Sequence, residues 1–307
     1  MIPLLLFYKI LQLSVIMMFG FVLVKSKIIK SGDSVVLSKI SLYLLMPAVI
    51  INSFDIEMTE DIMNGLALAF AGAFAIHIVF LAVDMIYKRV FNGTSVERAS
   101  IIYPNAANLI IPIVSYVLGD EWVIYSCAFL SVQIFFIWTH GIQLFSTGEK
   151  LNFKKILLNI NIIAIAIGVI LMVSGIRLPQ LVKDVSSSLG SMLGSVGMLI
   201  AGMLAAEIDF KSVLANKRLY LVLIMRMLIC PLIILVMMKC VCSVLLINNA
   251  EKILLISFLA SITPSAATVM QFAQINNKEV DFAVGINIIT TVVCIVTMPV
   301  FVALYQI

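Results

Sequence analysis

The stretch Tyr103-Pro104-Asn105-Ala106-Ala107-Asn108 decides the fold, because a similar stretch, Thr263-Pro264-Ser265-Ala266-Ala267-Thr268, follows 160 residues later. Each copy places a proline inside an apolar segment and follows it with small and polar residues. Proline removes one backbone donor and clashes with the preceding turn, so each copy predicts an interrupted helix. In apolar surroundings the freed backbone groups need partners, which favours a break that lines a cavity over an ordinary kink. We therefore predict helix breaks at Pro104 and Pro264.

The composition around these motifs is that of a polytopic helical membrane protein. Of 307 residues, 63% are hydrophobic and 12% are charged, against roughly 45–50% and 25% in soluble domains. A soluble fold of this length has too little interior for so much apolar surface, which excludes a cytosolic enzyme, a nucleic-acid binder and a disordered chain. The apolar runs are continuous rather than alternating, which excludes a transmembrane barrel.

Ten apolar runs are long enough, at about 20 residues each, to cross a bilayer as helices. They cover residues 3–24, 35–54, 61–87, 98–118, 122–146, 156–174, 187–206, 218–243, 253–275 and 281–305. The proline motifs fall in the fourth and ninth runs, so the chain divides into two five-helix repeats, 1–147 and 153–307. A repeat with an odd number of spans inserts its second copy upside down, as in secondary transporters. We predict an all-α membrane fold in which helices four and nine are broken and cross near the bilayer midplane.

The distribution of basic residues predicts the orientation of the chain. If the N-terminus is outside the cytoplasm, thirteen Lys and Arg residues fall in cytoplasmic loops and three in outer loops, in accord with the positive-inside rule. The thirteen are Lys25, Lys27, Lys30, Lys88, Arg89, Arg98, Lys150, Lys154, Lys155, Lys211, Lys217, Arg218 and Lys278. The three are Arg177, Lys183 and Lys252. We therefore expect a multi-pass protein of the cell membrane with both termini outside the cytoplasm.

Neutral polar side chains follow both predicted breaks. Half-helix N-termini at the crossing would present free N–H groups and the positive end of a dipole, which suit an anion. Amides and hydroxyls bind a carboxylate without the cost of a buried charge. We predict that the substrate contacts Asn105, Asn108, Ser265, Thr268 and Gln271. For Asn105 and Ser265 the alternative is that they only satisfy the broken backbone.

One further amide and several ionisable residues lie elsewhere in the spans. Asn52, late in the second span, is expected to face the same cavity as a further substrate contact. Arg226 is expected to attract an anionic substrate, to pair with an acid such as Glu207, or to extend to the cytoplasmic surface. His77 in the third span and His140 in the fifth are candidates for carrying a coupling proton; the alternative for each is a buried histidine that only makes hydrogen bonds.

Residues 104–112, Pro-Asn-Ala-Ala-Asn-Leu-Ile-Ile-Pro, and the later Gly119-Asp120-Glu121 resemble the fourth-helix motif of the auxin efflux carrier family. Bacterial members of that family typically read Gly-Asn-x-Gly-x-x-Gly-Ile-Pro, with a Gly-Glu pair further on. The matching positions are Asn105, Ile111, Pro112 and Gly119, whereas Pro104, Ala107 and Ile110 depart from the family's glycines. The stretch 260–299 resembles the family's last two helices, and Gly202, Arg226 and Pro231 also fit, so the resemblance covers essentially the whole chain.

The resemblance implies a fold similar to that of bile-acid symporters and sodium/proton antiporters. Helices one, two, six and seven would form a scaffold, and helices three to five and eight to ten a moving transport domain. Family members export or exchange organic anions, so we expect a secondary transporter for small organic anions such as dicarboxylates or auxin-like carboxylates. The glycines of the seventh helix, Gly190, Gly194, Gly197 and Gly202, favour a homodimer through the scaffold helices.

Two other functions stay open. The first is a sodium- or proton-coupled symporter of organic anions; neither proline motif contains Asp or Glu, which disfavours direct cation binding at the crossing and leaves uniport as the simpler mechanism. The second is a non-transporting membrane sensor, although the loops are too short for a soluble output domain. The sequence contains no metal-spaced His/Cys cluster, phosphate-binding Gly-rich loop or nucleophile–base motif. We therefore expect no enzymatic activity, no cofactor, no metal and no nucleic acid, with the organic anion and the lipid bilayer as partners.

Overall fold

The computed structural model describes residues 2–57, 59–145, 157–242 and 248–307. Three of the basic residues used to predict the orientation, Lys150, Lys154 and Lys155, lie outside the described residues. The predicted boundary between the two repeats, at residues 147–153, lies outside them as well.

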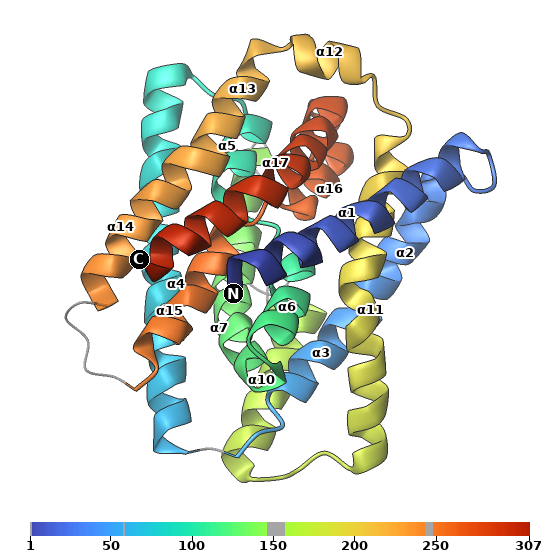
Figure 1. The fold of residues 1–307 in the computed structure, drawn as a ribbon. Coiled ribbons are helices and arrows are strands. Elements are labelled where there is room, and N and C mark those ends of the chain that lie inside the picture. Colours follow the sequence, from blue (N-terminus) through green and yellow to red (C-terminus); the bar gives the residue numbers. More distant parts are fainter. Residues whose placement is uncertain (1, 58, 146–156, 243–247) are drawn as a thin grey trace.

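The described part of the chain is helical (Figure 1). The first half contains α1 (Ile2–Lys25), η1 (Ser31–Asp33), α2 (Ser34–Ile40), η2 (Ser41–Leu45), α3 (Met46–Ser53), α4 (Glu60–Phe91), α5 (Ser95–Ile102), α6 (Ala106–Val117), η3 (Asp120–Trp122), α7 (Val123–Phe136), η4 (Ile137–Gly141) and α8 (Ile142–Phe145). The second half contains α10 (Ile160–Ser174), α11 (Gln180–Ala205), α12 (Phe210–Ala215), α13 (Lys217–Ile224), η5 (Met225–Ile229), α14 (Cys230–Cys242), α15 (Ala250–Ser261), α16 (Ala267–Ile275) and α17 (Val280–Gln306).

Within the described ranges, seven helices are long and apolar enough to cross a membrane. They are Ile2–Lys25, Ser31–Ser53, Glu60–Phe91, Asp120–Phe145, Gln180–Ala205, Lys217–Cys242 and Val280–Gln306, three of which join several of the elements above. The helix α10 is apolar but shorter. The fold is therefore that of an all-α membrane protein. The short helix α12 was not predicted from the sequence.

The longest helix, α4, begins and ends where its sequence carries end signals. Thr59 Oγ1 accepts a hydrogen bond from the Ile62 N–H over 3.3 Å at the N-terminus. Lys88 and Arg89 lie in the last turn, where positive charge complements the helix dipole. Asn92 follows in the left-handed conformation, with φ at 49°, and ends the helix.

The helix breaks predicted at the two prolines are present. The first separates α5 from α6, and the second separates α15 from α16. The extended segments between the half-helices pair with each other in an antiparallel bridge. The Asn105 N–H donates to Pro264 O over 2.7 Å, and the Ala266 N–H donates to Tyr103 O over 2.9 Å. Each break thus supplies hydrogen-bond partners for the other, as buried backbone groups require.

Three π-helical turns interrupt the long helices of the described chain. The turn η2 precedes Pro47, and the turn η5 precedes Pro231. A proline ring clashes with the carbonyl four residues before it, and these carbonyls, at Tyr43 and Met227, lie inside the two wider turns. The third turn, η4, contains His140 and has no proline after it in α8. Its cause is therefore not a proline, and π turns of this kind are frequent at functional sites.

Small residues on α11 allow the close approach of other helices of the same chain. A Cβ atom added to Gly202 would lie 1.8 Å from Met17 O of α1, and one added to Gly20 would lie 2.3 Å from Leu199 O of α11. Gly190 faces Val49, and Gly194 faces Pro112. Three of the four glycines that suggested a dimer interface therefore pack against the chain itself, which is the usual role of small residues in membrane helices.

Candidate functional site

Side chains from two long helices complete the backbone pairing at the crossing, the place where the extended segments of the two breaks meet. Gln133 Nε2 of α7 donates to Pro104 O over 2.7 Å, and Asn287 Nδ2 of α17 donates to Ser265 O over 2.5 Å. Thr290 Oγ1 of α17 accepts the Ser265 N–H over 3.1 Å. A buried backbone group left without a partner would cost about 1–3 kcal/mol. These side chains therefore hold the extended segments in place in apolar surroundings.

A cavity of about 280 Å³ adjoins the crossing, and we call it the crossing cavity. One wall comes from α7, η4, α16, α17 and the two breaks, and the other from α2, η2, α3, α10 and α11, together with Asn159. Its polar lining consists of amides and hydroxyls, from Ser38, Ser41, Asn105, Gln133, Asn159, Asn161, Thr268, Gln271 and Asn287. The described lining residues include no Asp, Glu, Lys, Arg or His. Asn105, the residue that precedes α6, and Ala267 and Thr268, the first residues of α16, line it, so the N-terminal ends of two half-helices face a neutral space.

The structure brings together three of the predicted substrate contacts, Asn105, Thr268 and Gln271, in the lining of the crossing cavity. The backbone of Asn108 belongs to α6, but its side chain lies outside the described residues. Ser265 is fully buried and does not belong to the lining. Its N–H and C=O groups are both taken by α17, so the structure favours the alternative interpretation, in which Ser265 completes the broken backbone.

Arg226 is fully buried and binds the C-terminal ends of α5 and α15, the two half-helices that precede the breaks. Nη1 donates to Ile101 O of α5 over 3.1 Å, and Nη2 donates to Ser261 O of α15 over 2.7 Å. Nε and Nη2 both donate to Thr263 O, over 3.1 and 2.5 Å. The guanidinium Cζ also lies 5.5 Å from the centre of the Phe80 ring. Its charge therefore compensates the negative ends of α5 and α15, and the positive ends of α6 and α16 remain directed at the crossing cavity.

Two of the expectations for ionisable residues differ from the structure. Glu207 is exposed and forms none of the ion pairs found among the described residues, so Arg226 does not pair with it. Arg226 also does not reach the surface, because backbone carbonyls hold it inside. His77 is buried, with Nδ1 2.8 Å from Ala73 O and its ring stacked on Phe136 at 5.2 Å. It lines neither of the cavities described here.

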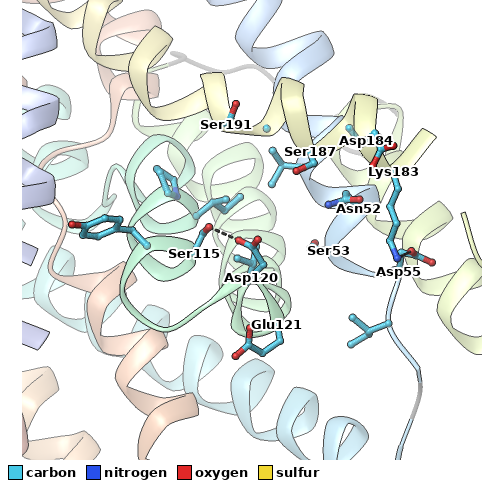
Figure 2. A pocket seen from close by; sticks show the side chains of 18 of the residues that line it. Asn52, Ser53, Asp55, Ser115, Asp120, Glu121, Lys183, Asp184, Ser187 and Ser191 are labelled. Atoms are coloured by element: carbon cyan, nitrogen blue, oxygen red, sulfur yellow. Dashed lines mark hydrogen bonds and ion pairs between the residues drawn. The ribbon is translucent and has the colours of Figure 1, made fainter. Parts of the chain in front are cut away.

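A second and larger cavity, of about 820 Å³, contains Asn52 (Figure 2). It lies between α3 and α11 on one side and α6 and η3 on the other. Asn52 was expected to share a site with Asn105, but the two line different cavities. Figure 2 shows Asp120 and Glu121 across the space from Asp55 and Lys183. Its charged lining residues are Lys9, Lys183, Asp55, Asp120, Glu121 and Asp184, so acids outnumber bases and the cavity does not favour a bound anion.

Asp55 anchors the segment after α3 to the start of α11. Its carboxylate lies 2.6 Å from Lys183 Nζ and 3.8 Å from Arg177 Nη1, and it accepts the Leu178 N–H over 3.1 Å. Burial alone raises the pKa of Asp55, but the hydrogen bonds from Lys183 and Leu178 and the charges of Lys183 and Arg177 outweigh it, so its pKa lies below its ordinary value. No sequence pattern revealed the pairing of Asp55 with Lys183 and Arg177.

A chain of polar contacts that the sequence did not predict leads from α4 to the crossing. Arg98 donates to both carboxylate oxygens of Asp84, over 2.8 and 2.6 Å. His140 Nε2 lies 3.4 Å from Asp84 Oδ2, and His140 Nδ1 lies 2.9 Å from Tyr103 Oη. Tyr103 Oη also lies 3.0 Å from Phe136 O. The four side chains come from α4, α5, η4 and the break itself, so only the fold brings them together.

Comparison with known protein families gives one match, which covers nearly the whole chain. No curated protein matches it. A family model described as membrane transport protein matches it twice, over residues 5–154 and over residues 149–302. The two matches to one model in the two halves support an internal repeat, and together they span nearly all of the helical bundle. The chain therefore belongs to the membrane transport protein family, that of the auxin efflux carriers.

Proposed function

We propose that the protein is a secondary carrier of small organic anions, which bind in the crossing cavity. Membership of a transporter family makes it a membrane transport protein and not an enzyme. The observation that carries the proposal is the arrangement of four half-helices around Arg226. Their two negative ends are bound by one guanidinium, and their two positive ends line a neutral cavity.

The architecture that we propose has ten membrane crossings. The seven long helices supply seven of them, α10 supplies an eighth, and the broken pairs α5–α6 and α15–α16 supply the other two. The two halves would then be inverted copies, residues 1–147 and 153–307, with both termini outside the cytoplasm. The two matches to one family model support this division.

Alternating access requires one part of the molecule to move against another. We propose that α1, α2, η2, α3, α10 and α11 form the scaffold and that the remaining long helices move with the crossing. The crossing cavity lies between these two groups, so a displacement of one group changes the side from which the cavity opens. The close packing of α1 on α11 at Gly202 supports a rigid scaffold.

The lining of the crossing cavity sets the class of substrate. At about 280 Å³ the cavity is close to the lower limit of ordinary ligand sites, so it suits a small molecule. Backbone N–H groups, amides and hydroxyls supply donors for a carboxylate, and no buried carboxylate among the lining residues opposes it. Trp138 and Phe272, with ring centres 6.0 Å apart, supply an apolar surface for the remainder of the molecule.

Uptake by purified protein in liposomes tests the proposal. We expect uptake of labelled malonate or indole acetate above that of protein-free liposomes. Thr268→Val should reduce this uptake at least about tenfold, since one hydrogen bond to a charged group contributes about 1.5–3 kcal/mol. Asn105→Asp should abolish it, because a carboxylate would repel the anion at the same position.

Thr297→Val is the matched control for Thr268→Val. Among the described residues, Thr297 Oγ1 bonds only to Val293 O of its own helix and lines neither cavity, so uptake should not change. Equal uptake by the wild type, Thr268→Val and Asn105→Asp would show that the crossing cavity is not the substrate site. If the wild-type protein takes up none of the carboxylates tested, the proposed function is wrong.

A further inference from the structure

We infer that His140 binds the proton that couples anion transport to a proton gradient, at a site separate from the crossing cavity. This inference rests on the proposed function for its transport consequence, but the proton site itself is defined by geometry alone. Three observations carry it: the position of His140 in a π turn, its two contacts with Asp84 and Tyr103, and the connection of Tyr103 to the crossing.

The π turn η4 connects the two sites. Ile137 and Trp138 of this turn line the crossing cavity, while His140, two residues later, contacts Asp84 instead. The side chain of His140 is 24% exposed, so the described helices do not enclose it completely. A shift of this turn therefore displaces a wall of the substrate cavity and a titratable group together.

The imidazole of His140 lies between two groups of different hydrogen-bonding character. The carboxylate of Asp84 only accepts hydrogen bonds, whereas the hydroxyl of Tyr103 both donates and accepts. A neutral imidazole that donates from Nε2 to Asp84 accepts the Tyr103 hydroxyl at Nδ1. A protonated imidazole donates from both nitrogens, so the Tyr103 hydroxyl must turn to another acceptor.

That second acceptor is already in place, because Tyr103 Oη lies 3.0 Å from Phe136 O and 2.9 Å from His140 Nδ1. Binding of a proton at Nδ1 thus turns the hydroxyl hydrogen of Tyr103 from His140 to Phe136, with no bond lost. Tyr103 is also the residue whose carbonyl accepts the Ala266 N–H in the bridge between the two breaks. The protonation of His140 is therefore communicated to the crossing through a single residue.

The charges around His140 set the sign of the coupling. It contacts Asp84 of α4, which is paired with Arg98 of α5, and Tyr103 of the first break. The helices α8 and α16 contribute no titratable side chain among their described residues. Arg98 and Asp84 compensate each other, so a proton on His140 adds one positive charge. That charge is compensated when the neighbouring cavity holds an anion, which favours binding of the proton and the anion to the same conformation.

Histidine and tyrosine NMR tests the site without any substrate. The chain has two histidines, so a His77→Gln background leaves His140 as the single histidine signal. We expect the ring signals of His140 and Tyr103 to change with pH at one common midpoint, and the Tyr103 change to disappear in His140→Gln. A Tyr103 signal that is insensitive to pH, or that still responds in His140→Gln, would overturn the inference.

Transport under a pH gradient tests the coupling. With the membrane potential held at zero and the probe ionised on both sides, a gradient of one pH unit should change the malonate accumulation ratio about tenfold for one coupled proton. His140→Gln keeps one donor and one acceptor but cannot bind the additional proton, so we expect its malonate accumulation ratio not to respond to the gradient. Wild-type uptake that ignores the gradient would refute the coupling and leave the proposed carrier function intact. Absence of any carboxylate uptake would refute that function, and the NMR result would then decide the proton site.

Discussion

Arg226 and Ile101 are 125 residues apart in the chain, yet Nη1 of the arginine donates to the carbonyl oxygen of the isoleucine over 3.1 Å. The same guanidinium reaches Ser261 and Thr263 on the other broken helix. One side chain therefore holds the negative ends of both half-helices, in the way that a bound cation would hold them.

We predict that Arg226→Ala lowers the free energy of unfolding by roughly 3–5 kcal/mol, because it leaves three buried carbonyls without donors. Arg226→Lys should be intermediate, since it keeps the charge but cannot span both helices with one planar group. Thermal unfolding in detergent measures both. Arg89→Ala removes an exposed arginine and should change stability by less than about 0.5 kcal/mol. Equal stability of Arg226→Ala and Arg89→Ala would contradict the role assigned to Arg226.

Thr290 is predicted to stabilise the second break through its hydroxyl. Thr290→Val leaves the Ser265 N–H without an acceptor, which should cost about 1–3 kcal/mol and lower uptake as the break loosens. The comparison is Thr297→Val on the same helix, whose hydroxyl serves only its own helix. A difference between the two variants of less than about 0.5 kcal/mol in chemical or thermal unfolding would show that the bridge does not need this bond.

The contact of α1 with α11 is predicted to tolerate no side chain at Gly202. In Gly202→Ala the new methyl would lie 1.8 Å from Met17 O, so the helices must separate, at a cost of about 1–3 kcal/mol. Gly32→Ala is the matched control, because nothing lies within 4 Å of its added Cβ. The unfolding midpoints of the two variants, measured under the same conditions, test this prediction. A Gly202→Ala protein as stable as Gly32→Ala would mean that the helices separate at little cost.

The ion pairs of Asp55 predict a pH-dependent contribution to stability. Because the folded state lowers the pKa of Asp55, the stabilisation is complete above the unfolded value of about 3.9 and is lost as the pH falls through the lower folded value. Asp55→Asn should therefore cost about 1–2 kcal/mol between roughly pH 5 and 8, and the difference from wild type should shrink below about pH 4. Unfolding measured across this range checks the sign. A deficit that grows on acidification would contradict it.

The two breaks, and from their spacing the repeat, could be predicted because the effect of proline on a helix is local. Pro104 and Pro264 each remove a donor at a fixed place in an apolar run, so their consequences depend little on the rest of the fold. The lining role of Asn105, Thr268 and Gln271 followed from their proximity to those breaks.

The partners of charged residues could not be predicted, because they are set by contacts between distant segments. Arg226 was recognised as an ionisable residue within a span, but its acceptors are backbone carbonyls, which every residue carries and no pattern marks. Asp55 lies in a loop of ordinary composition, and its burial depends on the start of α11, more than 120 residues later. Asn52 is in the expected span, but the direction in which it faces depends on how α3 packs against α11.

The bridge between Pro104 and Ser265 consists of main-chain atoms alone. If the two halves descend from one ancestral five-helix unit, the bonds of this joint depend less on sequence than side-chain contacts do, because substitutions alter side chains and leave N–H and C=O groups in the backbone. Each copy can then diverge in the residues that line the cavity while the main-chain bridge between the copies is retained. New substrate preferences can evolve in one half without a compensating change in the other.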